Sequence, residues 1–130
     1  MNGRRAILGL ERGRATLDLV PPVYKICSRA EWAAAERAGV FAGSAVDRAD
    51  GFIHLSAREQ VEETARRHFA GQDDLVIVEI DAEQLGSALR WEPSRGGALF
   101  PHLYGPLPVT AATAVHPLPR GPSGHLLPWR

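Results

Sequence analysis

The chain has 130 residues, with 15 Lys and Arg side chains against 15 Asp and Glu and a single cysteine, Cys27. This length suits one domain with its own core. The balanced charge argues against a module that binds nucleic acid through bulk electrostatics, although a local basic pocket remains compatible with it. A lone cysteine cannot form a disulfide within the chain, which favours a reducing, cytoplasmic compartment. No segment is long and apolar enough to span a membrane.

The first residues look like an extension ahead of the domain. Arg4 and Arg5 precede an apolar run that stops at Glu11, which makes the run shorter than a signal-peptide core. We therefore expect a disordered or mobile N-terminal extension at residues 1–20. A single domain is expected over residues 21–118 and an irregular, proline-rich tail over residues 119–130.

Residues 23–27 predict the first strand, because branched and aromatic side chains dominate this segment. Alternation along the strand places Lys25 on the same face as Val23 and Cys27. Lysine is uncommon in strand interiors. Lys25 is therefore either a solvated residue that protects a sheet edge from aggregation or a group that faces a binding cleft.

A first helix is predicted to begin at Ser28, which has the spacing of a capping box with Glu31, and to end at Gly39. Its alanine-rich composition supports a helix. Residues 40–50 are expected to form a loop, closed by the turn signal Asp50-Gly51.

Residues 51–56 predict a second strand that contains a histidine. His54 and Ser56 share one face of it. A buried imidazole needs hydrogen-bond partners, so His54 is either a core histidine bonded to backbone groups or a ligand-binding or acid–base group at a strand end. Ser56, with Glu59 three residues later, is interpreted as a helix start whose free N–H groups suit a phosphate.

The second helix carries Val61, Ala65 and Phe69 at four-residue steps, which predicts a buried stripe. A helical turn is expected at residues 81–85, and strands are expected at residues 75–80, 88–92 and 109–115, of which the first is apolar enough to be central. Two helices in the first half and strands in the second favour an α+β domain over a doubly wound sheet. No glycine-rich phosphate loop joins a strand to a helix, which argues against dinucleotide binding of the Rossmann kind.

A second segment with polar groups covers residues 94–106. Arg95, followed by two glycines, either offers a guanidinium and bare amides to a phosphate or carboxylate or lies in an exposed turn. His102 lies between Pro101 and Pro106, whose fixed backbone angles serve packing or hold polar groups in position. The spacing of the histidines and the lack of a cysteine pair argue against a metal site. No nucleophile elbow surrounds Ser56, which argues against catalysis by a serine nucleophile. The glutamates form no obvious carboxylate pair.

Several motifs together resemble one known family. They are Val23-Tyr24-Lys25-Ile26, Asp50-Gly51-Phe52-Ile53-His54-Leu55-Ser56, Glu59-Gln60-Val61, His68-Phe69-Ala70-Gly71, Asp74-Leu75-Val76 and Phe100-Pro101-His102-Leu103-Tyr104-Gly105-Pro106. In this order they resemble the bacterial domain of unknown function 952 family over residues 22–118. The resemblance implies a small split antiparallel β-sheet domain of the ADP-ribosyltransferase-like fold, which binds NAD in a cleft.

The resemblance also implies roles for individual positions. A polar residue on the first strand, often histidine, bonds to the NAD ribose, and Lys25 stands there in this chain. His54 and Ser56 match the second-strand motif, which contacts the nicotinamide side. The catalytic glutamate of toxin-like branches has no counterpart in residues 109–115.

Three functions stay open at this point. The first is an NAD-binding ADP-ribosyltransferase-like enzyme with His54 and His102 as catalytic residues; Lys25, Ser56, Arg95 and Tyr104 would bind the cofactor, with Tyr104 as a stacking ring. NAD would then be a substrate, and no metal would be needed. The second is a non-catalytic module that binds a nucleotide or another small molecule. The third is a phosphoester hydrolase that uses the two histidines as acid and base.

Overall fold

The computed structural model describes residues 20–129 and shows an α+β domain with antiparallel sheets. The extension expected at residues 1–20 lies, apart from Val20, outside the described residues. The helices and strands are β1 (Val23–Ser28), α1 (Arg29–Ala38), β2 (Val40–Phe41), α2 (Ala45–Asp50), β3 (Ile53–His54), α3 (Val61–His68), β4 (Leu75–Ile80), β5 (Leu89–Pro93), β6 (Leu99–Leu103), β7 (Leu107–Pro108), β8 (Ala112–Leu118), β9 (Arg120–Gly121) and β10 (Gly124–His125).

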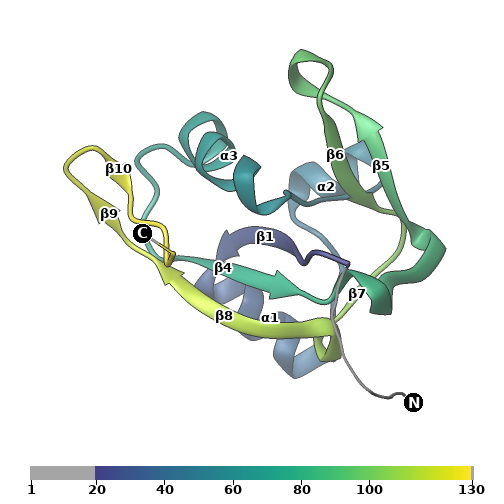
Figure 1. Cartoon of the computed structure of the whole chain (residues 1–130). Coiled ribbons are helices and arrows are strands. Elements are labelled where there is room, and N and C mark those ends of the chain that lie inside the picture. The colour runs from purple at the N-terminus through teal and green to yellow at the C-terminus, as the bar shows by residue number, and fades with distance from the viewer. Residues whose placement is uncertain (1–19, 130) are drawn as a thin grey trace, which may run out of the picture.

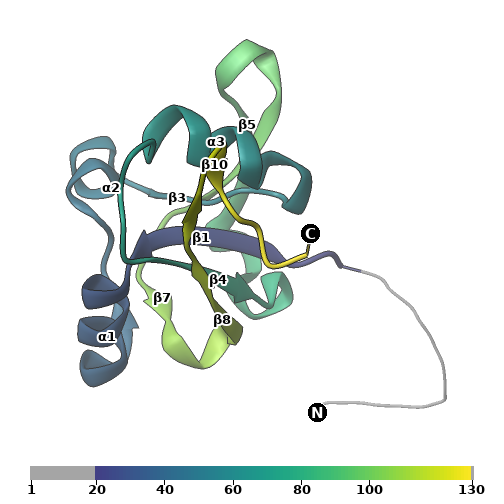
Figure 2. The same ribbon diagram turned by 90° about the vertical axis from the view of Figure 1, so that its left-hand side faces the viewer.

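The first sheet has the order β1-β4-β8, with the apolar strand β4 at its centre as its sequence predicts. Helix α1 lies on one face of this sheet and α3 on the other (Figure 1; Figure 2). Alternation along β1 sends Val23 and Cys27 into the core under α1, and Tyr24 and Ile26 into the core under α3. The sheet is therefore covered on both faces.

The second sheet has the order β3-β6-β5, and its hairpin β5–β6 projects from the body of the molecule (Figure 1). A single antiparallel bridge between Tyr24 and Ser56 connects the end of the β3 segment to β1 of the first sheet. Lys25 follows Tyr24, and His54 precedes Ser56 by two residues. The bridge therefore brings the strand that carries Lys25 next to the segment that carries His54.

Residues 40–50 differ from the loop expected there. They form the short strand β2 and the helix α2, which raises the number of α-helices in the first half of the chain from two to three. Helix α2 begins at a capping box, in which Ser44 Oγ accepts from the Asp47 N–H at 3.2 Å and the Asp47 carboxylate accepts from the Ser44 N–H at 2.9 Å. It ends at Gly51, whose φ of 88° is accessible to glycine at little cost.

The helix after β3 does not begin at Ser56, so this prediction was wrong. The backbone N–H and C=O of Ser56 pair with Tyr24 across the bridge, and the capping residue is Ala57, whose N–H donates to Gln60 Oε1 at 2.9 Å. A 3₁₀ turn at Arg58–Gln60 then leads into α3. The predicted buried stripe is confirmed at Val61 and Ala65, which are buried in the core under α3, whereas Phe69 directly follows the helix and is partly buried against the same core.

The C-terminal part is more regular than its prolines suggest. A 3₁₀ turn at Val109–Ala111 displaces the last long strand to residues 112–118, and residues 119–130, expected to be irregular, contain the hairpin β9–β10. The chain then returns to the sheet, where Leu127 is buried and the Trp129 ring lies edge-on to Tyr24 at 5.1 Å. These apolar side chains order the tail because they cover the core under α3. None of the helices in residues 20–129 is long and apolar enough to cross a membrane.

Candidate functional site

Residues from the predicted segments line one cavity of about 590 Å³. Lys25 comes from β1, His54 and Ser56 from β3 and the residues after it, and His102 from β6. Helices α2 and α3 close the other sides of the cavity. This volume lies within the range of small-molecule sites, roughly 300–1,000 Å³.

Asp47 is the buried centre of this site, and only 2% of its side chain is exposed. Its Oδ2 accepts from Lys25 Nζ at 2.8 Å and from the Ser44 N–H, while its Oδ1 accepts from the His54 N–H at 3.0 Å and His54 Nδ1 at 2.6 Å. Burial would raise the pKa of Asp47, but the hydrogen bonds from His54 and the charge of Lys25 hold that pKa well below its ordinary value. Asp47 is therefore an ionised carboxylate in the interior.

Lys25 is not a solvated edge residue, because only 5% of it is exposed. Its ammonium group donates to Asp47 and, at 3.1 Å, to the backbone carbonyl of His54, and it lies 5.7 Å from the Phe41 ring centroid. Two of its three N–H groups thus hold α2 and β3 together. Lys25 lines the cavity with its charge already paired.

His54 is part of the cavity wall and not a sealed core histidine, since 36% of its side chain is exposed. Its Nδ1 faces Asp47, and its Nε2 lies 2.9 Å from the carboxylate of Asp50. Carboxylates only accept hydrogen bonds, so a ring that bonds to both must carry a proton on each nitrogen.

His102 is the cross-strand partner of His54 in the register of β3 and β6. Side chains of such partners lie on the same face of a sheet, and the two imidazole centroids are 5.8 Å apart. The Phe52 ring lies against both, with centroid distances of 4.6 Å to His54 and 4.1 Å to His102. The His102 Nδ1 is 2.8 Å from Glu92 Oε1.

The other predicted binding residues differ in their placement. The buried Ser56 hydroxyl lines the cavity 3.2 Å from Thr64 Oγ1. Tyr104 does not line it: its hydroxyl donates to Glu92 at 2.8 Å, and its partly exposed ring contacts both Phe52 and Arg90. The backbone of Arg95 lies in the turn between β5 and β6, and its side chain is outside the described part of the chain.

Sequence reasoning missed four carboxylates that line this cavity or contact its histidines: Glu31, Asp47, Asp50 and Glu92. The spacing of Ser44 and Asp47 is that of a capping box and is a readable signal for helix α2. The contact between Glu92 and His102 depends on the pairing of β5 with β6, which sequence spacing alone does not reveal.

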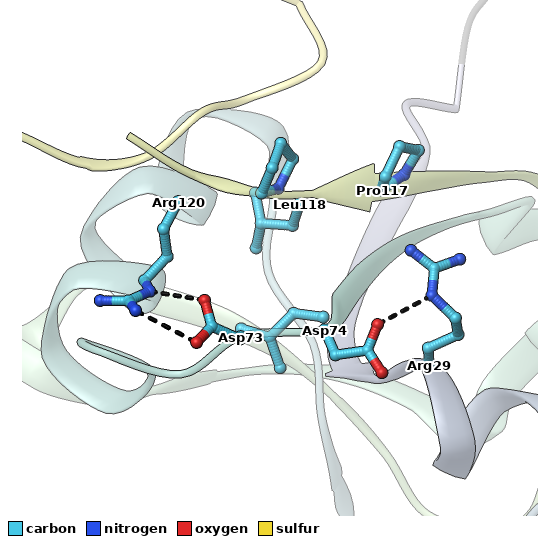
Figure 3. Close-up of a pocket in the computed structure, with 8 residues that line it drawn as sticks. Arg29, Asp73, Asp74, Pro117, Leu118 and Arg120 are labelled. Carbon is cyan, nitrogen blue, oxygen red and sulfur yellow. Dashed lines mark hydrogen bonds and ion pairs between the residues drawn. The ribbon is translucent and has the colours of Figure 1, made fainter. Parts of the chain in front are cut away.

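A second cavity, of about 440 Å³, lies beside the start of β4 and the end of β8. Its guanidinium groups are paired, with Arg29 on Asp74 at 3.1 Å and Arg120 on Asp73 at 2.7 Å (Figure 3). The predicted site residues all lie elsewhere. Within residues 20–129, no group of three or more His, Cys, Asp or Glu side chains is arranged to hold a metal ion.

The family model described as "Protein of unknown function (DUF952)" matches residues 26–115. The chain belongs to this family. Its sequence is 57% identical to CC0527 from Caulobacter crescentus, and the match covers 80% of this chain and 91% of that protein in its crystal structure, with a TM-score of 0.77. The solution NMR structure of CC0527 matches with a TM-score of 0.72 over 80% of this chain and 90% of that one. No curated protein matches the sequence significantly.

Proposed function

We propose that the cavity binds NAD and that the protein cleaves or transfers its ADP-ribosyl group, with His54 and His102 as catalytic residues. One observation carries the proposal: imidazoles from two distant segments are cross-strand partners, 5.8 Å apart, in the wall of a cavity of nucleotide size. The likeness to the ADP-ribosyltransferase-like fold is part of the proposal. Its support is the pair of antiparallel sheets that meet at Tyr24 and Ser56.

The charges of the cavity suit the reacting end of NAD. Glu31, Asp47 and Asp50 line it together with Lys25, so carboxylates are more numerous than lysine and arginine side chains among the described lining residues. The nicotinamide ring of NAD is positively charged, and the ribose carbon gains positive charge as the ring departs. Fixed carboxylates close to such a centre stabilise the transition state.

The reaction requires one bond to break and one to form. The glycosidic C–N bond breaks, and nicotinamide leaves with the electron pair, which neutralises its ring. An oxygen nucleophile then bonds to the ribose carbon, and its proton passes to an imidazole of the site. Lys25 acts as a positioning residue, because it bonds to Asp47 and to the His54 carbonyl.

A thermal-shift titration with NAD tests the binding step, because a ligand that binds the folded state raises the Tm. His54→Asn keeps a donor that can reach Asp47 and removes the distal ring nitrogen, and it should abolish the shift. His116→Ala is the matched control: its ring is 36% exposed like that of His54, but it lies outside the cavity lining. NADH, which lacks the ring charge, should bind more weakly. An unchanged Tm of the folded wild type at millimolar NAD would refute the proposal.

Nicotinamide release, followed by chromatography, tests the chemical step. The wild type should release nicotinamide from NAD, and His102→Ala should release it at least about 100-fold more slowly, as loss of an acid–base group implies. Saturable NAD binding without nicotinamide release would instead identify a binding module without catalysis.

Phosphoester hydrolysis is a second candidate because each imidazole has its own carboxylate partner. His54 pairs with Asp47 and His102 with Glu92, an arrangement that suits an acid and a base acting together. Hydrolysis of a phosphomonoester and phosphodiester panel, measured against pH, should give a bell-shaped profile that His54→Asn removes. A flat profile at the uncatalysed rate would exclude this candidate.

A further inference from the structure

We infer that Glu92 acts as a positioning residue that makes His102 the proton acceptor of the cavity, and that His54 is the proton donor. The inference deepens the proposed function and rests on its two-histidine site. It assigns different protonation states to two rings that the sequence alone does not distinguish.

The Glu92 carboxylate is hydrogen-bonded to both His102 and Tyr104. Its Oε1 lies 2.8 Å from His102 Nδ1 and accepts from the Tyr104 hydroxyl at 2.8 Å. The hydrogen bonds from His102 and Tyr104 lower the pKa of Glu92, and the same contact raises the pKa of Tyr104. Glu92 is therefore a carboxylate, Tyr104 a phenol, and the proton of the contact lies on His102 Nδ1.

The Nε2 edge of the His102 ring, opposite the contact with Glu92, differs from the Nδ1 edge. The Nε2 atom has no hydrogen-bond partner among the described side chains, which do not include that of Arg95, while the ring lines the cavity and stacks on Phe52 at an interplanar angle of 28°. Only 8% of the side chain is exposed. A neutral ring with its proton on Nδ1 presents a lone pair at Nε2, which is the form that accepts a proton.

His54 differs from His102 in the hydrogen bonding of its ring. Both of its nitrogens face carboxylates, Asp47 at 2.6 Å and Asp50 at 2.9 Å, so the doubly protonated ring fits its surroundings. Asp50 is half exposed and can yield its place to an oxygen of the ligand. The remaining titratable groups that line the cavity are Tyr24, Lys25, Glu31 and His68.

These states define the path of the proton. His102 Nε2 takes the proton of the attacking hydroxyl while the oxygen forms its bond to the ligand, and the leaving group departs with its electron pair. His54 donates a hydrogen bond from Nε2 to an oxygen of the ligand, and gives up the proton where the leaving group requires one. The His102 proton then returns to solvent.

Ring ¹⁵N NMR of the labelled protein without ligand reads these states directly. His102 should show a protonated Nδ1 and a bare Nε2, and His54 should show protons on both nitrogens in its hydrogen bonds to Asp47 and Asp50. Glu92→Gln should abolish the Nδ1–H preference of His102, whereas Tyr104→Phe, which leaves the contact between Glu92 and His102 in place, should preserve it. A wild-type His102 protonated on Nε2, or a Glu92→Gln spectrum with an unchanged His102 tautomer, would overturn the inference.

Kinetics then separate positioning from binding. With NAD as substrate, Glu92→Gln should lower kcat about 10- to 100-fold with little change in KM, because the base is misprotonated while the binding groups remain. The NMR result does not depend on NAD. Failure of NAD to bind, with the tautomers as described, would refute the proposed ligand and leave the assignment of donor and acceptor intact.

Discussion

Asp47 holds His54 at two points: Oδ1 accepts from the backbone N–H at 3.0 Å and lies 2.6 Å from the ring Nδ1. A ring fixed at both its backbone and its proximal nitrogen has little rotational freedom. The distal nitrogen is then directed at Asp50 on the exposed side of the ring. Helix α2, through Asp47 in its first turn, therefore determines the orientation of the histidine that the sequence singles out.

Replacement of Asp47 tests how far the site depends on this carboxylate. Asp47→Asn leaves the Lys25 ammonium buried without its counter-charge, and removal of one partner from a buried pair costs about 3–5 kcal/mol. The free energy of unfolding, measured by urea titration, should fall by this amount. Asp74→Asn is the control, because the pair of Asp74 with Arg29 is exposed and should contribute at most about 1 kcal/mol. Equal losses in the two variants would contradict the role given to Asp47.

The same carboxylate predicts how stability depends on pH. The pKa of Asp47 is lower in the folded protein than its ordinary value of 3.8, so folding favours the ionised form. The stability that this provides is complete above the ordinary value and is lost as the pH falls from there towards the folded-state pKa. The difference in unfolding free energy between the wild type and Asp47→Asn should be constant from neutral pH to about pH 5, and shrink below about pH 4. A difference that stays constant down to about pH 2.5 would show that the Asp47 pKa is not lowered by folding.

Much of the fold can be predicted from short-range patterns. The apolar run of β4, the capping box at Ser28 and the stripe through Val61 and Ala65 each report local geometry that the tertiary structure preserves. The tail could not be predicted in this way, because its prolines suggest irregular chain while Leu127 is ordered by the distant α3 and β1.

The candidate site was predictable only where its residues stand out in a local sequence pattern. His54 stands out as a polar residue in a predicted apolar strand and His102 as a polar residue between two prolines, and the register of β3 with β6 makes them partners. Asp47 could not be recognised in the same way, because α2 is only six residues long and too short for a hydrophobic period to show. Glu92 reaches His102 through the pairing of β5 with β6, which is a tertiary relationship.

Two adjacent leucines in the tail test whether it belongs to the core. Leu127 is 6% exposed and packs in the core under α3, whereas Leu126 is 54% exposed. Leu127→Ala should lower the free energy of unfolding by about 2–5 kcal/mol, as truncation of a buried leucine does. Leu126→Ala should change it by no more than about 0.5 kcal/mol. Similar values for both variants in urea titrations would show that the tail does not complete the core.

Two helix-ending glycines separate a stability effect from an effect on the site. Gly39 ends α1 with φ of 89° and Gly51 ends α2 with φ of 88°, and a Cβ at either position meets no atom within 4 Å. Alanine at either position should therefore cost a similar amount, about 1–2 kcal/mol, through backbone strain alone. Because Gly51 directly follows Asp50 and leads into β3, Gly51→Ala should also shift the His54 ring signals in NMR spectra, while Gly39→Ala should leave them unchanged. Unshifted His54 signals in Gly51→Ala would mean that the end of α2 does not set the position of this histidine.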